Sequence, residues 1–146
     1  MTRRSTRRTG PKEHRSFRLQ SGLLDALQRR ARESQEPLST IAERYLDEGL
    51  RHDEHPLIVF RTGAMGRRAT LAGTRLDVAQ VIETVKHSNN STHDAAEYLS
   101  IPEPWVRGCV RYYADFPDEI DEWIQRTRAI AEREEAAWRR TQAALA

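Results

Sequence analysis

Apolar and polar residues alternate over residues 14–20, and the spacing then becomes helical. Because strand side chains point alternately to opposite faces, Phe17 and Leu19 share one face of a predicted strand. The opposite, polar face holds His14, Ser16, Arg18 and Gln20. A lone strand has unpaired backbone groups along both edges, and no second strand pattern follows in the next forty residues or so. The pattern therefore predicts a partner strand from outside this part of the chain.

Two helices are predicted after the strand, separated by Pro37, which interrupts helical hydrogen bonding. We expect Ser21 and Ser39 as their N-caps. The first helix has an inner face of Leu24, Leu27, Gln28 and Ala31, and the second one of Ile41, Ala42, Tyr45, Leu46 and Leu50. One strand and two short helices cannot close a core alone. Antiparallel pairing of two copies would satisfy the strand edges, so we expect a dimer with contacts at Phe17, Leu19, Ile41 and Tyr45.

The segments HRSFRLQ, SGLLDALQRRARES and LSTIAERYLDEGL together resemble the ribbon-helix-helix superfamily of MetJ, Arc and CopG type repressors. The resemblance covers about forty residues and implies a dimer whose two-stranded ribbon enters the major groove of DNA. It implies base contacts from His14, Ser16 and Arg18, and phosphate contacts at the start of the second helix from Ser39 and Thr40. Arg18 is the strongest candidate, because a guanidinium can bond two acceptors of guanine at once. Gln20 departs from the Ser or Thr that often follows the strand in this family, which indicates a helix start shifted by one residue.

After a polar segment at residues 51–57, predicted to be a linker, the pattern changes. LIVF and RRATLAG predict two short strands around a turn from Gly63 to Gly66. Three helices are predicted next, the first capped by Asp77, the second by Ser91 and the third beginning near Pro102 to Pro104. Their inward positions are Val78, Val81, Ile82, Val85, Ala95, Ala96, Leu99, Val106, Cys109, Val110 and Tyr113. The short connection between the last two helices predicts a helix-turn-helix.

Residues 71–121 resemble a small helix-turn-helix family known as a domain of unknown function, several members of which are antitoxins of PIN-domain ribonuclease toxins. The similarity is carried mainly by Gly73 to Arg75 and by Tyr112 to Asp115. The third helix begins with Pro-Glu-Pro-Trp where the family has Thr-Pro-Glu, which puts its entry into a DNA groove in doubt. Arg107 and Arg111 on its polar side are candidate DNA contacts, and the alternative is that they are simply solvated.

One long helix is predicted from Pro117 to the end of the chain. Its apolar stripe is Ile120, Trp123, Ile124, Thr127, Ile130, Ala131, Ala137 and Trp138. The first half is expected to close the domain core. The second half is longer than a small domain needs, so Ile130 and Trp138 are candidates for contact with a dimer mate or with another protein.

Charge is concentrated at the beginning of the chain. Residues 1–20 contain seven basic residues and one acidic residue, a net charge of +6, whereas the whole chain has a net charge of +2. Such a segment attracts polyanions. We expect residues 1–12 to be a disordered basic arm whose Arg3, Arg4, Arg7 and Arg8 contact DNA phosphates, with a purely solubilising tail as the alternative. The two domains then span residues 13–52 and 58–146.

No catalytic or metal site is predicted. The histidine pairs His52/His55 and His87/His93 lack a ligand set at recognisable spacing, and Gly63 to Gly66 lacks the lysine and hydroxyl of a phosphate loop. No nucleophile with a base is evident, so we expect no enzyme, no metal and no cofactor. The single cysteine, Cys109, is expected in the core and suits a reducing compartment. The sequence has no apolar run of about eighteen residues, so no membrane span is predicted, and no secretory signal is evident.

The fold class expected from these patterns is mainly α, a dimeric ribbon-helix-helix followed by a helix-turn-helix domain with a small hairpin and a long C-terminal helix. The function expected is a sequence-specific DNA-binding repressor, acting as a homodimer or higher oligomer in the cytoplasm with the nucleoid, and as an antitoxin that represses its own operon and binds a protein toxin. Two alternatives remain open: a plasmid-maintenance or stand-alone regulator without a toxin, and an RNA-binding factor.

Overall fold

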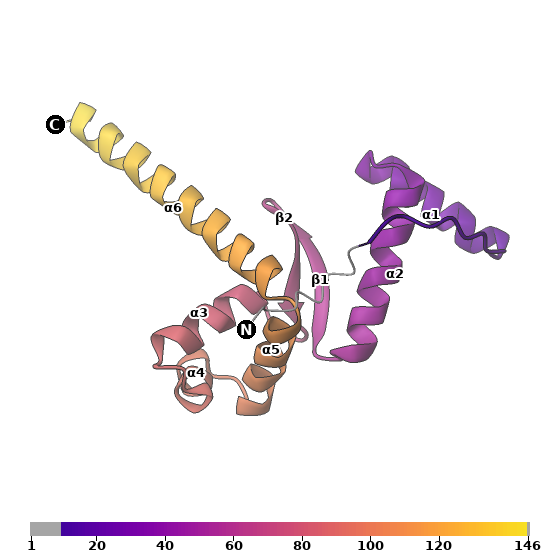
Figure 1. The fold of residues 1–146 in the computed structure, drawn as a ribbon. Helices are drawn as coiled ribbons and strands as arrows, with labels where there is room; N and C mark the ends of the chain where they lie inside the picture. The colour runs from indigo at the N-terminus through magenta and orange to yellow at the C-terminus, as the bar shows by residue number, and fades with distance from the viewer. Residues whose placement is uncertain (1–9, 146) are drawn as a thin grey trace.

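The computed structural model describes residues 10–145, which are mainly helical with a two-stranded antiparallel sheet. The elements are α1 Ser21–Ser34, α2 Leu38–Glu54, β1 Ile58–Gly63, β2 Gly66–Leu71, α3 Val78–His87, α4 Thr92–Leu99, α5 Glu103–Asp115 and α6 Pro117–Leu145. Figure 1 shows α1 and α2 at one side of the molecule, the hairpin beside α2, a group formed by α3, α4 and α5, and α6 projecting away from them. No helix within residues 10–145 combines the length and the hydropathy needed to cross a membrane.

Residues 10–20 form neither a helix nor a strand in the single chain. Helix α1 begins at Ser21, and the residue in the N-cap position is Gln20, with extended φ and ψ of −61° and 141°. The predicted N-cap role of Ser21 is therefore wrong by one residue. The predicted N-cap role of Ser39 is wrong by two residues, because α2 begins at Leu38 directly after Pro37, whose φ of −57° already suits the start of a helix. Gln28, expected on the inner face of α1, is exposed.

The core of the C-terminal part forms as the sequence pattern predicts. Strands β1 and β2 pair with Gly63 opposite Gly66, which leaves Ala64 and Met65 as a two-residue turn, and Gly66 adopts a φ of 115° that favours glycine. Helix α3 packs against β2, α4, α5 and α6. Its predicted N-cap, Asp77, and that of α4, Ser91, are both confirmed, and the Ser91 side chain accepts a hydrogen bond from the Asp94 backbone at 3.1 Å. All predicted inward residues of α3, α4 and α5 are buried or packed against the core.

Tyr112 was not among the predicted inward residues, although its side chain is fully buried. The prediction chose Tyr113, which is only partly buried and packs at the edge of the core. Helical spacing from Cys109 fits both tyrosines, at i+3 and at i+4, so periodicity does not decide between them. The Tyr112 hydroxyl donates a hydrogen bond to Glu119 at 2.8 Å and accepts one from Arg51 at 2.9 Å. Burial raises the pKa of Tyr112, so the phenol stays neutral.

Cys109 lies in the core as predicted and is completely buried. Burial raises the pKa of its thiol to about 12. The thiol is therefore protonated at neutral pH, and Cys109 acts as a small apolar residue.

The segment expected as a linker is instead the junction between α2 and the C-terminal domain. Helix α2 continues to Glu54, and Arg51 near its end lies with only 11% of its side chain exposed. Its guanidinium bonds Glu119 and the Tyr112 hydroxyl, lies 2.8 Å from the Asp47 carboxylate and stacks 4.1 Å from the Phe116 ring centre. Burial alone would lower the pKa of Arg51, but the Glu119 carboxylate reverses this and holds it above its usual value. The charged, nearly buried side chain of Arg51 therefore links α2 to the C-terminal domain.

Two further contacts support this junction. The His55 ring packs edge-on against Tyr112, with 5.2 Å between ring centres, and its Nε2 lies 2.9 Å from the Asp115 carboxylate. Arg67 of β2 makes a two-pronged pair with Glu48 of α2. These contacts hold α2 against both the hairpin and α5, so the N-terminal helices are not loosely tethered to the domain.

Replacing Arg51 with alanine tests this junction. The change leaves Glu119 without its charged partner in a half-buried place, and removing one member of such a pair should lower the free energy of unfolding by about 3 kcal/mol. Urea denaturation followed by circular dichroism measures it. The control is Arg29→Ala on the exposed face of α1, expected within about 0.5 kcal/mol of the wild type. A similarly small effect for Arg51→Ala would contradict the role assigned to this side chain.

Candidate nucleic-acid interface

The segment from His14 to Gln20 lies on the surface with every side chain exposed. Phe17 is 76% exposed and Leu19 is 48% exposed. Within residues 10–145, Lys12 of the arm forms an ion pair of 3.0 Å with Glu43 of α2. The polar side chains predicted to read bases, His14, Ser16 and Arg18, are therefore accessible, and so are the two apolar side chains between them.

Further apolar side chains are exposed on α1 and α2. Leu23 is 56% exposed, Leu46 63% and Leu50 51%, whereas Ile41 is completely buried and Tyr45 half-buried. We call Phe17, Leu19, Leu23, Leu46 and Leu50 the exposed leucine-rich surface. Exposed apolar side chains of this kind mark a protein contact when they form one contiguous patch. The two-helix module thus buries only part of its predicted apolar face by itself.

The start of α2 offers backbone groups to an anion. Ser39 and Thr40 are exposed in its first turn, and the first helical hydrogen bond is donated by Ile41 to Pro37 at 3.1 Å. The N–H groups before Ile41 have no acceptor within the helix because of helix geometry. Pro37 supplies no side-chain cap. The arrangement is therefore compatible with the phosphate contact predicted for Ser39 and Thr40.

Arg107 and Arg111 are exposed on α5, which follows α4 after a short turn at Ser100 to Pro102. Arg107 is already paired, with 2.7 Å between its Nη2 and the Glu103 carboxylate. The pKa of Glu103 is lowered, mainly by the hydrogen bond from the Thr92 hydroxyl and next by the hydrogen bond from Arg107. The start of α5 therefore presents an ionised carboxylate, which suits a DNA backbone poorly. Figure 1 shows α5 well apart from α1, with α2 and the hairpin between them.

Helix α6 leaves the domain halfway along its length. Ile120 and Ile124 are buried, and the hairpin is contacted through Arg126, which donates to the Met65 carbonyl at 2.9 Å. Ile130 is half-buried, and every described residue from Ala131 onward is exposed. Trp138 is 62% exposed. The first half of α6 thus closes the core as expected, and the second half has no cover within residues 10–145.

The arginines of the basic arm, Arg3, Arg4, Arg7 and Arg8, lie outside the described residues.

Two groups were missed by the sequence reasoning. Arg51 was assigned to a linker because its neighbours are polar, and His93 was considered only together with His87, whereas the structure places it beside carboxylates of α4 and α5. A search for carboxylates four residues from each histidine would have found Glu97.

Comparison of the chain with models of protein families, with curated proteins and with solved structures found no match.

The leucine-rich surface leads to a prediction about assembly. Replacing Leu19 with glutamate places a charge at the centre of the expected dimer contact, and burying an unpaired carboxylate is strongly unfavourable. We expect the variant to be a monomer in sedimentation equilibrium at concentrations where the wild type is a dimer.

Ser16→Glu is the matched control, because Ser16 points to the polar face of the predicted strand. This variant should keep the dimer. If Leu19→Glu sediments as a dimer, or if both variants are monomeric, residues 14–20 do not form the contact.

Proposed function

We propose that the chain is a sequence-specific DNA-binding repressor that acts as a dimer through residues 14–20. The observation that carries the proposal is the exposed pair Phe17 and Leu19, which lies beside polar and basic side chains in a segment that is neither helix nor strand in the single chain. Pairing this segment with its copy would satisfy its backbone hydrogen-bonding groups. It would also bury Phe17 and Leu19 of both chains against the helices. The same pairing would direct Ser16 and Arg18 of both chains outward as a ribbon that fits the major groove.

The electrostatics support the same surface. The first twenty residues have a net charge of +6, to which Arg15 and Arg18 contribute within the ribbon and Lys12 just before it. A dimer would present two such segments together. Because DNA binding releases counterions in proportion to the phosphates neutralised, the ribbon and arm offer far more favourable charge than the start of α5. We therefore assign base reading to the ribbon and leave Arg107 and Arg111 as secondary candidates.

We further propose that the exposed end of α6 binds a protein partner, as expected for an antitoxin that represses its own operon. Residues 118–146 contain five basic and seven acidic residues, a net charge of −2, which is unfavourable for DNA. A half-exposed tryptophan among alanines is a common anchor of protein interfaces. A toxin encoded by an adjacent reading frame is the partner that this proposal favours.

Base reading by Arg18 is tested with Arg18→Ala. Loss of a two-pronged guanine contact should weaken operator binding by about 1 to 3 kcal/mol and broaden the sequence preference. Fluorescence anisotropy with operator DNA, non-operator DNA and structured RNA measures both quantities, and preference for the RNA would favour the RNA-binding alternative.

Deleting residues 2–9 provides the comparison. Because flexible arginines act mainly through counterion release, the deletion should weaken binding to all duplexes equally and reduce the salt dependence. Loss of sequence preference on deletion, together with an unchanged preference in Arg18→Ala, would show that the arm reads the sequence instead.

Truncation after Ala131 tests the role of α6, because it removes only residues that the described structure leaves exposed, together with Ala146. Operator affinity should stay within about tenfold, a change of up to about 1.4 kcal/mol. The truncated chain should no longer co-purify with the co-expressed product of the adjacent reading frame. Trp138→Ala should lose this partner as well. If the truncated chain retains the same partner, the end of α6 is not the binding surface.

A further inference from the structure

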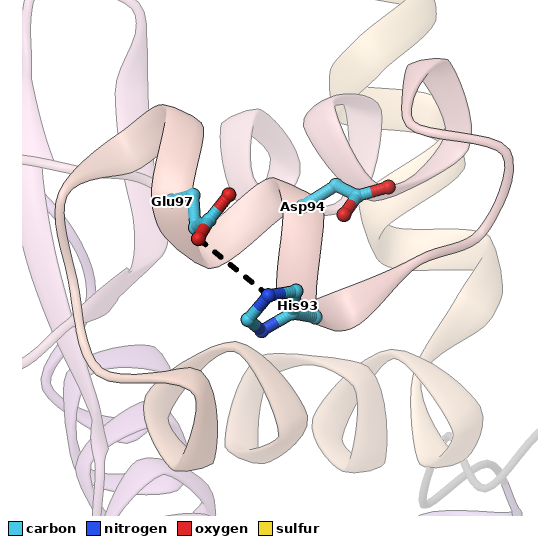
Figure 2. A group of neighbouring side chains, drawn as sticks. All are labelled: His93, Asp94 and Glu97. Atoms are coloured by element: carbon cyan, nitrogen blue, oxygen red, sulfur yellow. Dashed lines mark ion pairs between the residues drawn. The ribbon is translucent and has the colours of Figure 1, made fainter.

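Helix α4 carries an imidazole and two carboxylates close together, at His93, Asp94 and Glu97. Each offers one ligand atom, and these atoms lie within 4.8 Å of one another. Figure 2 shows the His93 ring below the helix, the Glu97 carboxylate turned toward it and Asp94 on the adjacent side of the same turn. His93 and Glu97 are four residues apart, so one helix face presents both. All three side chains are exposed, so an ion can reach them from solvent.

The separation of His93 and Glu97 matches the bite of a tetrahedral metal ion. The distance from His93 Nε2 to Glu97 Oε1 is 3.5 Å. Bonds of about 2.1 Å from zinc to nitrogen and to oxygen, at a tetrahedral angle, place the two ligand atoms about 3.4 Å apart. The pair can therefore chelate an ion without a change in the backbone. Asp94 is near enough to supply a third ligand after a side-chain rotation.

Glu103 of α5 adds a contact from outside the cluster. One of its carboxylate oxygens lies 3.7 Å from His93 Nδ1, and the other accepts hydrogen bonds from Thr92 at 2.8 Å and from Arg107 at 2.7 Å. The carboxylate is thus fixed by two elements at the nitrogen of His93 that does not face Glu97. At 3.7 Å this contact is longer than a hydrogen bond, so a small turn of the His93 ring is needed for Nδ1–H to donate to Glu103 and leave the Nε2 lone pair free for a metal.

We propose that His93, Glu97 and Asp94 bind one divalent transition-metal ion of the zinc class, with Glu103 orienting the His93 ring. Water completes the coordination. The imidazole selects zinc or nickel over magnesium and calcium, which prefer oxygen ligands alone. The ion would lie beside the turn between α4 and α5 and offset the carboxylates there. The sequence analysis missed this site because it weighed His93 only together with His87, although Glu97 lies four residues after His93 on the same helix. The proposal is independent of DNA binding.

Calorimetric titration of the full-length, EDTA-treated chain with zinc chloride tests the site. We expect one bound ion per chain. His93→Ala and Glu97→Gln should each weaken binding by at least about tenfold, and Glu103→Gln by about 10- to 100-fold, the usual range for a residue that orients a ligand. Excess magnesium chloride should not displace the zinc.

His87→Ala is the matched control. His87 is also exposed, near the end of α3, and its Nδ1 lies 2.7 Å from the Glu83 carbonyl, so it resembles His93 in exposure but has no carboxylate set. Its removal should leave zinc binding unchanged. The proposal is overturned if the wild type binds no zinc, if His93→Ala binds as tightly as the wild type, or if His87→Ala loses the site instead.

Discussion

A module of one extended segment and two helices has too little interior to cover its own apolar side chains, and this constraint determines how the N-terminal part of the chain has to be understood. Ile41 is completely buried there, while Phe17 and Leu46 remain largely in water. In the C-terminal part, the hairpin and α3, α4, α5 and the first half of α6 enclose a continuous core, and Trp138 lies beyond it on the exposed half of α6. The contrast within one chain indicates that the N-terminal surface is incomplete by itself, and the proposed second copy would supply both the missing cover and the missing strand.

In the proposed dimer, the junction at Arg51 would determine where the C-terminal domain of each chain lies. Because Arg51 joins α2 to Tyr112 and Glu119, each C-terminal domain would be held at a fixed place relative to the ribbon. Figure 1 shows the end of α6 on the side away from α1. If the chain binds DNA and a protein as proposed, a protein bound there would lie away from α1 and the ribbon, so both could bind the same dimer. This separation suits the two activities proposed for the chain.

Elements whose stability comes from local pattern were predictable. The helix from Val78 to His87 was located by its cap and its apolar spacing, and the hairpin by its paired glycines. Features that depend on distant partners were not. Arg51 and Tyr112 are 61 residues apart, and neither hydropathy nor spacing relates a polar residue at the end of one helix to a tyrosine in another. The cap at Ser39 was misplaced because the fixed φ of Pro37 starts the helix earlier than a hydroxyl would. In the candidate interface, every side chain from His14 to Gln20 is exposed, so the predicted alternation of the strand stays a prediction, and the pairing of Arg107 with Glu103 required the structure.

Hydrogen–deuterium exchange of the backbone amides of residues 14–20 in the full-length protein tests the central claim most directly. Amides that bond a partner strand exchange slowly, whereas those of an exposed, extended segment exchange at the rate of an unfolded peptide. The account predicts protection at alternate amides of this segment, as antiparallel pairing requires, and loss of that protection on dilution below the dimer dissociation constant. Exchange of all these amides at the unfolded rate, in a sample that sediments as a dimer, would contradict the ribbon and with it the proposed mode of DNA recognition.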